Sequence, residues 1–317
     1  MALLANILEK CFSKANAALT ILLKRPILKK HNNCYCCGES SLNAIYNNNL
    51  FRCIQCGHTI AAEKYFDFDF DTLYSEKYFK GEEYLDYLSD RQAIQRNFDK
   101  RLNHLHRIFP TRKPEFVLEI GAAYGFFANS LQNIFPKANY LGFEISAEPV
   151  LWAQQQLNID IRNEDYLASQ LPTQSFSDVF MWDVIEHLPD PALFLEKAYS
   201  EMTDGGHIHI TTGDIGRILP KIQGHRWRMI HPPTHLHYFT RHSLTLLLES
   251  KGFKVIYVTY PAIYRSIRQI WYSLFSLNKK RQKNRVHKHP ERNRFVGLNT
   301  YDIMFVVAEK TPVILHQ

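Results

Sequence analysis

The sequence contains no apolar run close to the roughly 18 residues that are needed to cross a bilayer. The nearest stretch extends from Ala15 to Leu23. Lys24 to Pro26 then follow, where a secretory signal would have small residues at its cleavage site. A membrane-spanning or exported chain is therefore not expected. Disorder is excluded as well, because 45% of the 317 residues are hydrophobic.

Cysteine is scarce: the chain has 6, far below the density of a small disulfide-bonded secreted scaffold. Four of them form two C-x2-C pairs, Cys34 with Cys37 and Cys53 with Cys56, separated by fifteen residues. This spacing is typical of a zinc ribbon, in which four thiolates hold one structural Zn²⁺. We therefore predict a zinc ribbon over residues 31–61 and a reducing, cytoplasmic location.

Two residues beside these pairs leave the ligand set partly open. Cys36 could replace a neighbouring thiolate, whereas His58, two residues after Cys56, is expected at the surface. Disulfide bonding is the less favoured alternative. The segment NAIYNNNL between the pairs has no basic residue, which argues against a nucleic-acid-binding finger.

Positive charge is confined to two parts of the chain. The formal net charge is +7; residues 1–30 contribute +5 and residues 265–294 contribute +9, so the remainder carries −7. Residues 1–30 have the apolar spacing of an amphipathic helix. Such a helix either packs on its own protein or lies at an anionic membrane surface as a peripheral contact.

The second basic segment, residues 261–300, begins with a predicted helix and continues with the run KKRQKNRVHKHPERNR. Three alternatives stay open: a solvated surface, docking on anionic lipid, or binding of RNA or a phosphate-bearing substrate. The apolar face of the predicted helix consists of Tyr264, Ile267, Trp271, Leu274 and Phe275.

Residues 111–310 alternate between short apolar strands and helices, which is the pattern of a parallel α/β sheet. Helices over 62–110 are expected to join this domain to the ribbon, with aromatic residues that either fill a core or form a lid. Residues 311–317 form a tail. Strands are predicted at 116–121, 140–146, 159–162, 177–188, 205–213, 253–260 and 301–310.

The first turn of this domain lacks the G-x-G-x-x-G fingerprint of dinucleotide-binding folds. Gly121 and Gly125 are separated by Ala-Ala-Tyr, and Glu119 precedes the turn. An acid at this place suits a ligand with an ammonium group rather than a phosphate. Glu144, at the end of the next strand, can accept hydrogen bonds from both hydroxyl groups of a ribose.

These residues belong to an ordered series that resembles the class I S-adenosylmethionine-dependent methyltransferases. The resemblance is to bacterial members with an N-terminal zinc-binding segment, related to the ubiquinone-biosynthesis methyltransferases. It implies a Rossmann-like, mostly parallel seven-stranded sheet with helices on both faces, preceded by a small zinc ribbon. The series consists of VLEIGAAYG at 117–125, Phe143 and Glu144, Asp165, WDVIEHLPDP at 182–191, and Trp227, Pro233, His235, Leu236 and Phe239.

The resemblance implies S-adenosylmethionine as the cofactor and assigns its contacts to residues at strand ends. These are Glu119, Gly121 and Gly125 at the methionine end, Glu144 at the ribose, Asp165 at the adenine amino group and Asp183 near the methyl donor. The middle glycine of the family's turn is Ala123 here; alanine fits if its φ is negative, and we expect binding to be retained with slightly altered packing of the turn. Glu119 and Asp165 could instead cap local turns.

Methyl transfer from a sulfonium is an in-line displacement, for which the enzyme mainly supplies alignment. A hydroxyl acceptor also needs a general base near neutral pH, and histidine is the common choice. We predict this base among His187, His235 and His237, in that order. The alternatives are histidines that only pack, or a metal site made by His231, His235 and an acid.

Two motifs of nucleic-acid methyltransferases are absent: a [DN]-P-P-[YF] sequence and a Pro-Cys pair after the fourth predicted strand. The expected acceptor is therefore a hydroxyl group on a small molecule, a glycan or a lipid precursor. Nucleic acid is the less favoured partner. An RNA methyltransferase that positions its substrate with the ribbon and the basic segment stays an alternative, as does a non-catalytic binding module.

Overall fold

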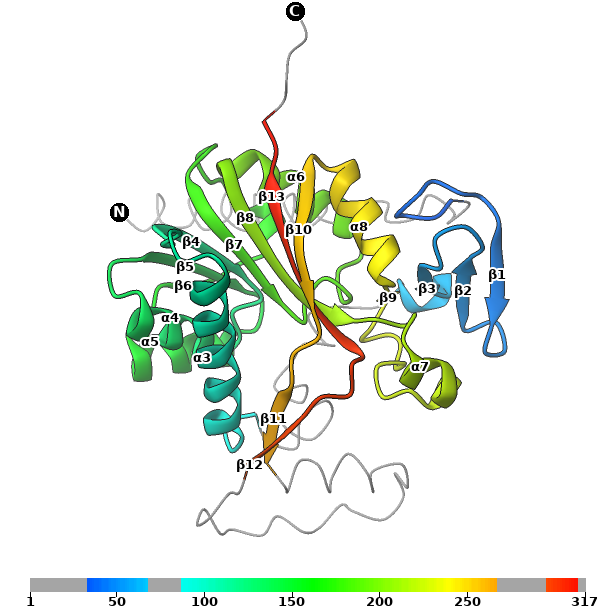
Figure 1. The fold of residues 1–317 in the computed structure, drawn as a ribbon, viewed down its shortest axis with the longest axis horizontal. Coiled ribbons are helices and arrows are strands. Elements are labelled where there is room, and N and C mark those ends of the chain that lie inside the picture. Colours follow the sequence, from blue (N-terminus) through cyan, green and yellow to red (C-terminus); the bar gives the residue numbers. More distant parts are fainter. Residues whose placement is uncertain (1–32, 68–86, 267–294, 313–317) are drawn as a thin grey trace, which may run out of the picture.

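The computed structural model describes residues 33–67, 87–266 and 295–312. The predicted helix over 1–30, the middle of the basic segment and the end of the tail lie outside these residues. The described chain forms a large sheet between two layers of helices, with a smaller sheet beside it (Figure 1). None of its described helices is long and apolar enough to cross a membrane.

Seven strands form the central sheet in the order β10-β13-β8-β7-β4-β5-β6. Only β13 runs against its neighbours, and it pairs antiparallel with both β8 and β10. The predicted mostly parallel, seven-stranded Rossmann-like sheet is confirmed. The strands are β4 (Phe116–Ile120), β5 (Asn139–Glu144), β6 (Ile161–Asn163), β7 (Phe176–Trp182), β8 (Met202–Gly213), β10 (Phe253–Thr259) and β13 (Ile303–Lys310).

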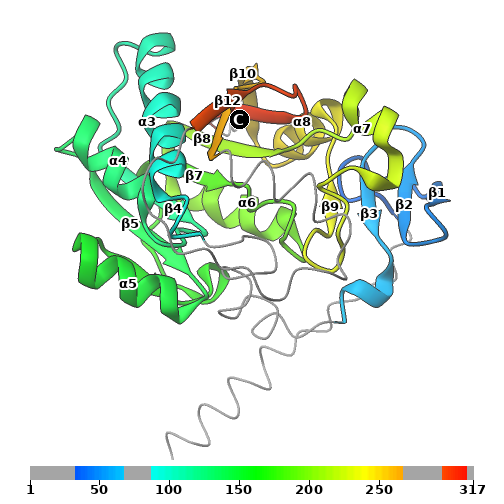
Figure 2. The ribbon, with the colours of Figure 1, turned by 90° about the horizontal axis from the view of Figure 1, so that it is seen from below.

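Successive side chains of each strand point to opposite faces, so each central strand is apolar on both sides. In β7, Phe180 and Trp182 pack in one apolar cluster while Val179 and Met181 pack in another. Helices on both faces therefore cover the sheet (Figure 2). One layer contains α3 (Arg91–Ile108), α4 (Phe126–Ile134) and α5 (Ala147–Leu157), and the other contains α6 (Pro191–Glu201) and α8 (Arg241–Ser250).

Short sequence signals determine where α6 and α8 begin. The Asp190 carboxylate accepts the N–H groups of the first turn of α6, and Pro191 occupies the first helical position. At α8, Thr240 and Ser243 form a reciprocal capping box. These caps set the ends of the loop after β7 and of the segment 227–240, which carry the predicted histidines.

The cysteine segment forms part of a four-stranded antiparallel sheet in the order β1-β2-β3-β9. Its fourth strand comes from far along the chain, since Thr59 pairs with Tyr238 and Ile60 with His237. Figure 1 shows this sheet beside the α8 end of the central sheet. The cysteine segment is thus joined to the domain of the central sheet by strand pairing. The strands are β1 (Leu42–Ile45), β2 (Leu50–Cys53), β3 (Thr59–Ala61) and β9 (His237–Tyr238).

The ends of the basic segment form a hairpin that packs on α3. Tyr264 was expected on a helix, but it lies in β11 (Ile263–Ser266), which pairs with β12 (Phe295–Leu298). Asn97 of α3 exchanges two hydrogen bonds with the backbone of Tyr264, at 2.7 and 2.9 Å. The pairing of β11 with β12 therefore determines the conformation at Tyr264, and the helical spacing of the apolar residues does not. The remaining short elements are η1 (Glu63–Tyr65), η3 (Tyr166–Ala168), α7 (Ile218–Gln223) and η4 (Gly224–Arg226).

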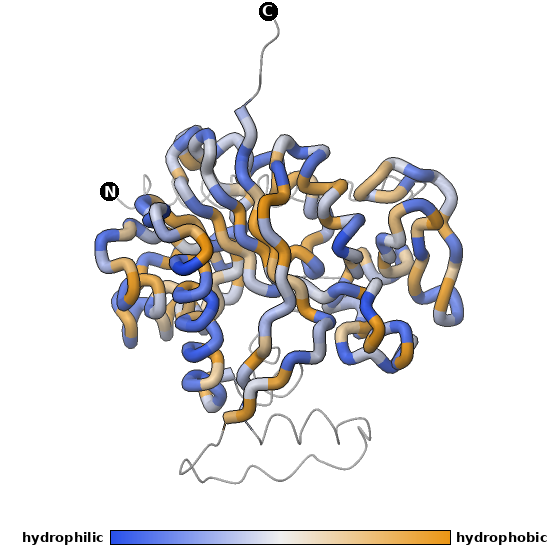
Figure 3. Tube along the Cα trace, viewed as in Figure 1, coloured by the Kyte–Doolittle hydropathy of each residue, from blue (hydrophilic) through white to orange (hydrophobic). Residues whose placement is uncertain are grey.

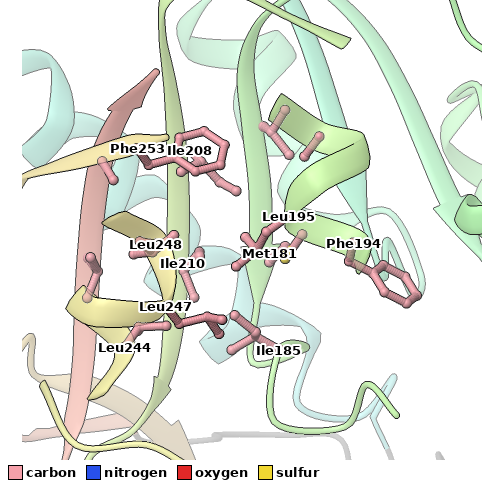
Figure 4. Packing of buried hydrophobic residues seen from close by; sticks show 14 of the residues in the cluster. Met181, Ile185, Phe194, Leu195, Ile208, Ile210, Leu244, Leu247, Leu248 and Phe253 are labelled. Atoms are coloured by element: carbon pink, nitrogen blue, oxygen red, sulfur yellow. The ribbon is translucent and has the colours of Figure 1, made fainter. Parts of the chain in front are cut away.

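The main core lies between the middle strands and the layer of α6 and α8 (Figure 4). Figure 3 shows apolar stretches running along the central strands. In the close view, Leu247 of α8 approaches Ile185 and Ile210, and it is 0% exposed. Because Ile185 lies between the candidate site residues Asp183 and His187, this core also supports the loop after β7.

We expect Leu247→Ala to lower the free energy of unfolding by about 2–5 kcal/mol, because it leaves a cavity beside Ile185 and Ile210. Leu151→Ala is the matched control: Leu151 also lies on a helix but is 54% exposed. We expect that variant to change stability by less than about 1 kcal/mol. Urea denaturation followed by circular dichroism measures both. Equal effects in the two variants would contradict this packing.

Candidate functional site

The turn after β4 contains three residues in the left-handed region. The φ angles are +79° at Gly121, +45° at Ala123 and +71° at Gly125. A Cβ atom added at Gly121 would lie 2.5 Å from Cγ2 of Val184, which belongs to the loop after β7. Glycine is therefore required at 121 by both conformation and space, and it brings the two loops into contact.

Ala123 corrects one expectation. We expected a negative φ, but its φ is +45°, where a Cβ atom costs about 1 kcal/mol. The backbone N–H of Ala123 donates to Oε2 of Glu144 at 2.9 Å. This charge-assisted hydrogen bond helps to hold the turn in its strained conformation.

Glu144 ends β5 and fixes the neighbouring backbone. Its Oε1 accepts the N–H of Ser146 at 2.9 Å, while its Oε2 accepts that of Ala123. Burial raises the pKa of Glu144, although these two N–H donors oppose the shift. A carboxylate oxygen has more than one lone-pair site, so Glu144 can still accept hydroxyl donors of a ligand.

Glu119 lies one strand away and is 2% exposed. The Tyr140 hydroxyl donates to its Oε2 at 2.5 Å. Burial raises the pKa of Glu119 well above its usual range; the Tyr140 hydrogen bond opposes this, and the Glu144 charge adds to it. The partner Tyr140 could not be predicted from the sequence, because its position on β5 becomes adjacent to Glu119 only through strand pairing.

Asp183 follows β7 with a φ of +55°. Its N–H donates to the backbone oxygen of Thr211 at 3.1 Å and to Oγ1 of Thr211 at 3.0 Å. Its Oδ1 is buried and has no hydrogen-bond partner among the described residues. A strained backbone that holds an unpaired carboxylate oxygen in place is a feature of ligand sites, and this one suits a cation.

Asp165 lies further out, after β6. Its side chain is the N-cap of η3 and accepts the N–H of Leu167 at 2.9 Å. Asp165 is exposed, so the rest of its carboxylate can accept hydrogen bonds from a ligand. The acids predicted from the sequence thus lie within β4, at the end of β5, or after β6 or β7, along one edge of the parallel sheet.

Four polar side chains gather where the loop after β7 meets the segment before β9. The rings of His187 and His235 are 4.5 Å apart between centroids, and those of His231 and His235 are 3.8 Å apart. Glu186 joins them, since ligand atoms of Glu186, His187 and His235 all lie within 4.8 Å of one another. The sequence predicted the histidines as site residues. It did not predict Glu186, although this residue is adjacent to His187.

His187 and His235 share one arrangement. Nδ1 of His187 is 2.8 Å from the backbone oxygen of Thr234, and Nδ1 of His235 is 2.8 Å from that of Met229. A carbonyl oxygen only accepts, so in both rings Nδ1 carries a hydrogen, and Nε2 carries the lone pair when the ring is neutral. Burial lowers the pKa of His235 well below its usual range, and His231 and His187 add to this.

The side chain of His237 lies in a different environment. It is 1% exposed and its Nδ1 lies 3.3 Å from Nε2 of His58, on which it also stacks. His58 was expected at the surface, but it is 1% exposed, with Nδ1 3.8 Å from the sulfur of Cys34. The pairing of β3 with β9 buries both rings. His237 thus contacts the ribbon, and the cluster of Glu186, His187 and His235 does not include it.

The four predicted cysteine ligands are brought together. The sulfur atoms of Cys34 and Cys56 are 3.5 Å apart, as are those of Cys37 and Cys53, and all four lie within 4.8 Å of one another. A disulfide would need about 2.05 Å, whereas a tetrahedral site with Zn–S bonds near 2.3 Å places its sulfurs about 3.8 Å apart. The geometry therefore fits one Zn²⁺. Cys36 offers an alternative set with Cys34 and His58.

Comparison with known proteins identifies one family. A family model described as a methyltransferase domain matches residues 90–258, more than half of the chain. No curated protein matches the chain. Among solved structures, an S-adenosylmethionine-dependent methyltransferase from Archaeoglobus fulgidus is 20% identical, with 76% of this chain and 100% of that chain covered and a TM-score of 0.46. One from Methanosarcina mazei is 15% identical, with 63% and 94% covered and a TM-score of 0.43.

Because Ala123 has a positive φ, we expect Ala123→Gly to leave the free energy of unfolding unchanged or to raise it by up to about 1 kcal/mol. The matched control is Ala128→Gly in the interior of α4, which should lower it by about 1 kcal/mol. Thermal and urea unfolding measure both variants. A loss at position 123 as large as that at 128 would show that the turn does not carry this strain.

Proposed function

The chain belongs to the class I S-adenosylmethionine-dependent methyltransferases, and on that premise we propose that it methylates a hydroxyl group of a small-molecule, glycan or lipid-precursor acceptor. The proposal rests on one observation: the loop after β7 contacts both the turn after β4 and the segment that contains His235. Val184, the residue after Asp183, packs against Gly121 of the turn after β4. Four residues after Asp183, His187 joins His235.

The first set would hold the cofactor, whose sulfonium supplies an activated methyl group. Glu144 would accept the ribose hydroxyls with oxygens that the N–H groups of Ala123 and Ser146 already orient. The unpaired Oδ1 of Asp183 supports a cationic ligand at this place. Glu119 with the glycine turn would face the methionine end, and Asp165 would face the adenine amino group.

The second set would activate the acceptor. Methylation of a hydroxyl forms an O–C bond, breaks the S–C bond and releases the hydroxyl proton. The Nδ1 contacts of His187 and His235 leave Nε2 as the basic nitrogen of the neutral rings, and burial, which lowers the pKa of His235, favours its neutral form. We place the activating group at this pair, with His187 first because it is less buried. We give His237 a positioning role against the ribbon.

The ribbon would contribute a structural zinc site made by Cys34, Cys37, Cys53 and Cys56, because a closed set of four thiolates leaves no open position for catalysis. The described ribbon strands contain one basic residue, Arg52, which hydrogen-bonds to Thr59. This composition supports a small-molecule acceptor over RNA.

The proposal includes a cytoplasmic protein with peripheral contact to an anionic membrane. Two isoleucines of α7, Ile218 and Ile222, are 72% and 77% exposed, and Lys221 lies beside them. Exposed aliphatic side chains next to a basic residue support such a contact.

Isothermal calorimetry with Glu144→Gln tests the cofactor site. We expect the purified wild type to bind S-adenosylmethionine, and the variant to bind it about 10- to 100-fold more weakly, because hydrogen bonds to a charged group contribute about 1.5–3 kcal/mol. Glu249→Gln, on the exposed face of α8, is the control and should bind as the wild type does. Transfer of a labelled methyl group to hydroxyl acceptors then tests the reaction. Absence of cofactor binding by a folded wild type would end the proposal.

Metal analysis tests the ribbon. We expect one zinc per chain in the wild type and its loss, with a lower melting temperature, in the double variant Cys53→Ser/Cys56→Ser. Cys36→Ser is the matched control, because Cys36 is buried in the same segment but outside the four-thiolate set. Zinc retained in the double variant, or lost equally in the control, would contradict this ligand set.

A further inference from the structure

A buried carboxylate that the sequence did not single out lies behind the acceptor side of the site. Asp302 is the residue before β13, and it is 0% exposed. We propose that Asp302 is a positioning residue for His235. It acts through Trp227 and Arg228, which precede the carbonyl group that orients the His235 ring. The inference rests on the proposed methylation of a hydroxyl group, and it specifies how one histidine is held in the form that can accept a proton.

Asp302 accepts hydrogen bonds from two neighbouring residues of the segment before β9. Nε1 of Trp227 donates to its Oδ2 at 2.7 Å, and the Arg228 guanidinium donates to both carboxylate oxygens. The Thr300 hydroxyl donates to Oδ1. Burial acts to raise the pKa of Asp302, but the hydrogen bonds and the charge of Arg228 outweigh it and hold this pKa below its usual range. The group is therefore an ionised carboxylate with strong, directional donors.

The Trp227 ring is also fixed at its face. It is 1% exposed, and a Cβ atom added at Gly213 would lie 2.9 Å from its Cη2 atom. Gly213 ends β8, so the ring packs directly on the backbone of the central sheet. A ring that is held by a hydrogen bond at its edge and by backbone at its face has a single orientation.

The turn before Asp302 is strained. Tyr301 has a φ of +54°, in the left-handed region that a bulky residue rarely adopts. Its N–H donates to Oδ1 of Asn299 at 2.8 Å, and its carbonyl oxygen accepts Nε of Arg217 at 3.0 Å. Tyr301 is 57% exposed whereas its neighbour Asp302 is fully buried. Strain of this kind persists where the surrounding structure determines the conformation, so the place of the carboxylate is tightly constrained.

Met229, the residue after Arg228, connects this anchor to the histidine. The N–H of Ile230 donates to the carbonyl oxygen of Trp227 at 2.9 Å, which closes a turn around Met229. The Met229 carbonyl oxygen is 2.8 Å from Nδ1 of His235, so this nitrogen carries a hydrogen. In the neutral ring Nε2 is then the basic nitrogen. Without a fixed carbonyl, the ring would also adopt the other tautomer, in which Nε2 cannot accept a proton.

Stability alone does not account for this ion pair. A buried pair contributes little more than apolar residues of the same volume, because both charges lose hydration. Trp227 already packs in the apolar cluster of the cysteine segment, which holds this part of the chain in place. The carboxylate adds direction, since it fixes two adjacent side chains and thereby the peptide groups between them and Met229.

The test follows the Nδ1–H of His235 by ¹H–¹⁵N NMR of the full-length protein labelled with ¹⁵N-histidine. His235→Gln identifies the resonance by its loss. We expect a hydrogen-bonded Nδ1–H in the wild type, and exchange with water at least about tenfold faster in Asp302→Asn and in Trp227→Phe. Asp302→Asn removes the charge at nearly constant volume. Trp227→Phe removes the N–H donor and keeps an aromatic ring.

Asp214→Asn is the matched control. Asp214 is 2% exposed and also lies at the carboxyl end of β8, but its carboxylate accepts hydrogen bonds from the Tyr260 hydroxyl at 2.6 Å and the Gly216 N–H at 2.9 Å. We expect this variant to lower the melting temperature, as Asp302→Asn does, because each removes a buried hydrogen-bonded charge. The exchange of the His235 Nδ1–H should stay unchanged in it, which separates positioning from general stability.

Three results would overturn the positioning role. They are a wild-type His235 whose hydrogen lies on Nε2, equal acceleration in Asp214→Asn, and unchanged exchange in folded Asp302→Asn, or in Trp227→Phe if Asp302→Asn does not fold. Calorimetry with S-adenosylmethionine is carried out on the same samples, and Asp302→Asn should bind it as the wild type does. A protein that binds the cofactor but shows one of these results keeps the proposed function and loses the inference. A folded wild type that binds no cofactor loses the proposed function and the reaction that the positioning would serve.

Discussion

One backbone carbonyl, that of Glu186, connects the parts of this molecule. It accepts the N–H groups of both Leu236 and His237, which lie about fifty residues further along the chain. The same short segment continues as β9 and completes the sheet of the ribbon. The loop after β7, the histidine cluster and the cysteine segment therefore share one set of backbone hydrogen bonds, so a displacement of any one would be transmitted to the others.

A second constraint is the burial of acids. Glu119, Glu144 and Asp183 lie at or near the same edge of the sheet, and burial raises the pKa of Glu119 and of Glu144. The fold compensates unequally: Glu144 receives two backbone N–H groups, Glu119 receives one phenol hydroxyl, and Oδ1 of Asp183 has no partner among the described residues.

Features that depend on the pattern of neighbouring residues could be predicted from the sequence. Features that depend on pairing between distant segments could not. Strand periodicity and the acids at strand ends predict the sheet and the order of the candidate cofactor residues, because both are properties of consecutive residues. The burial of His58 was not predictable, since it requires β9, nearly 180 residues away, to cover the ribbon. Tyr264 has helical spacing, yet its pairing with β12 and with Asn97 places it in a strand. Ala123 adopts a positive φ because Glu144 holds its N–H, a tertiary contact that outweighs the preference of alanine.

This connectivity gives the cysteine segment a structural role. A metal site closed by four thiolates has no open position for methyl transfer. It can, however, stiffen β3, the strand that pairs with β9. Cys34 contacts His58, His58 contacts His237, and His237 lies two residues after His235. The side chains of Cys34, His58 and His237 are all buried, which restricts the backbone of β9 two residues after His235. The proposed methyl transfer to an acceptor oxygen would need such a rigid support, because small displacements strongly reduce the rate of an in-line displacement. In the proposed function, the zinc site would thus support the acceptor side, just as the Glu144 carboxylate holds the N–H of Ala123 in the turn after β4.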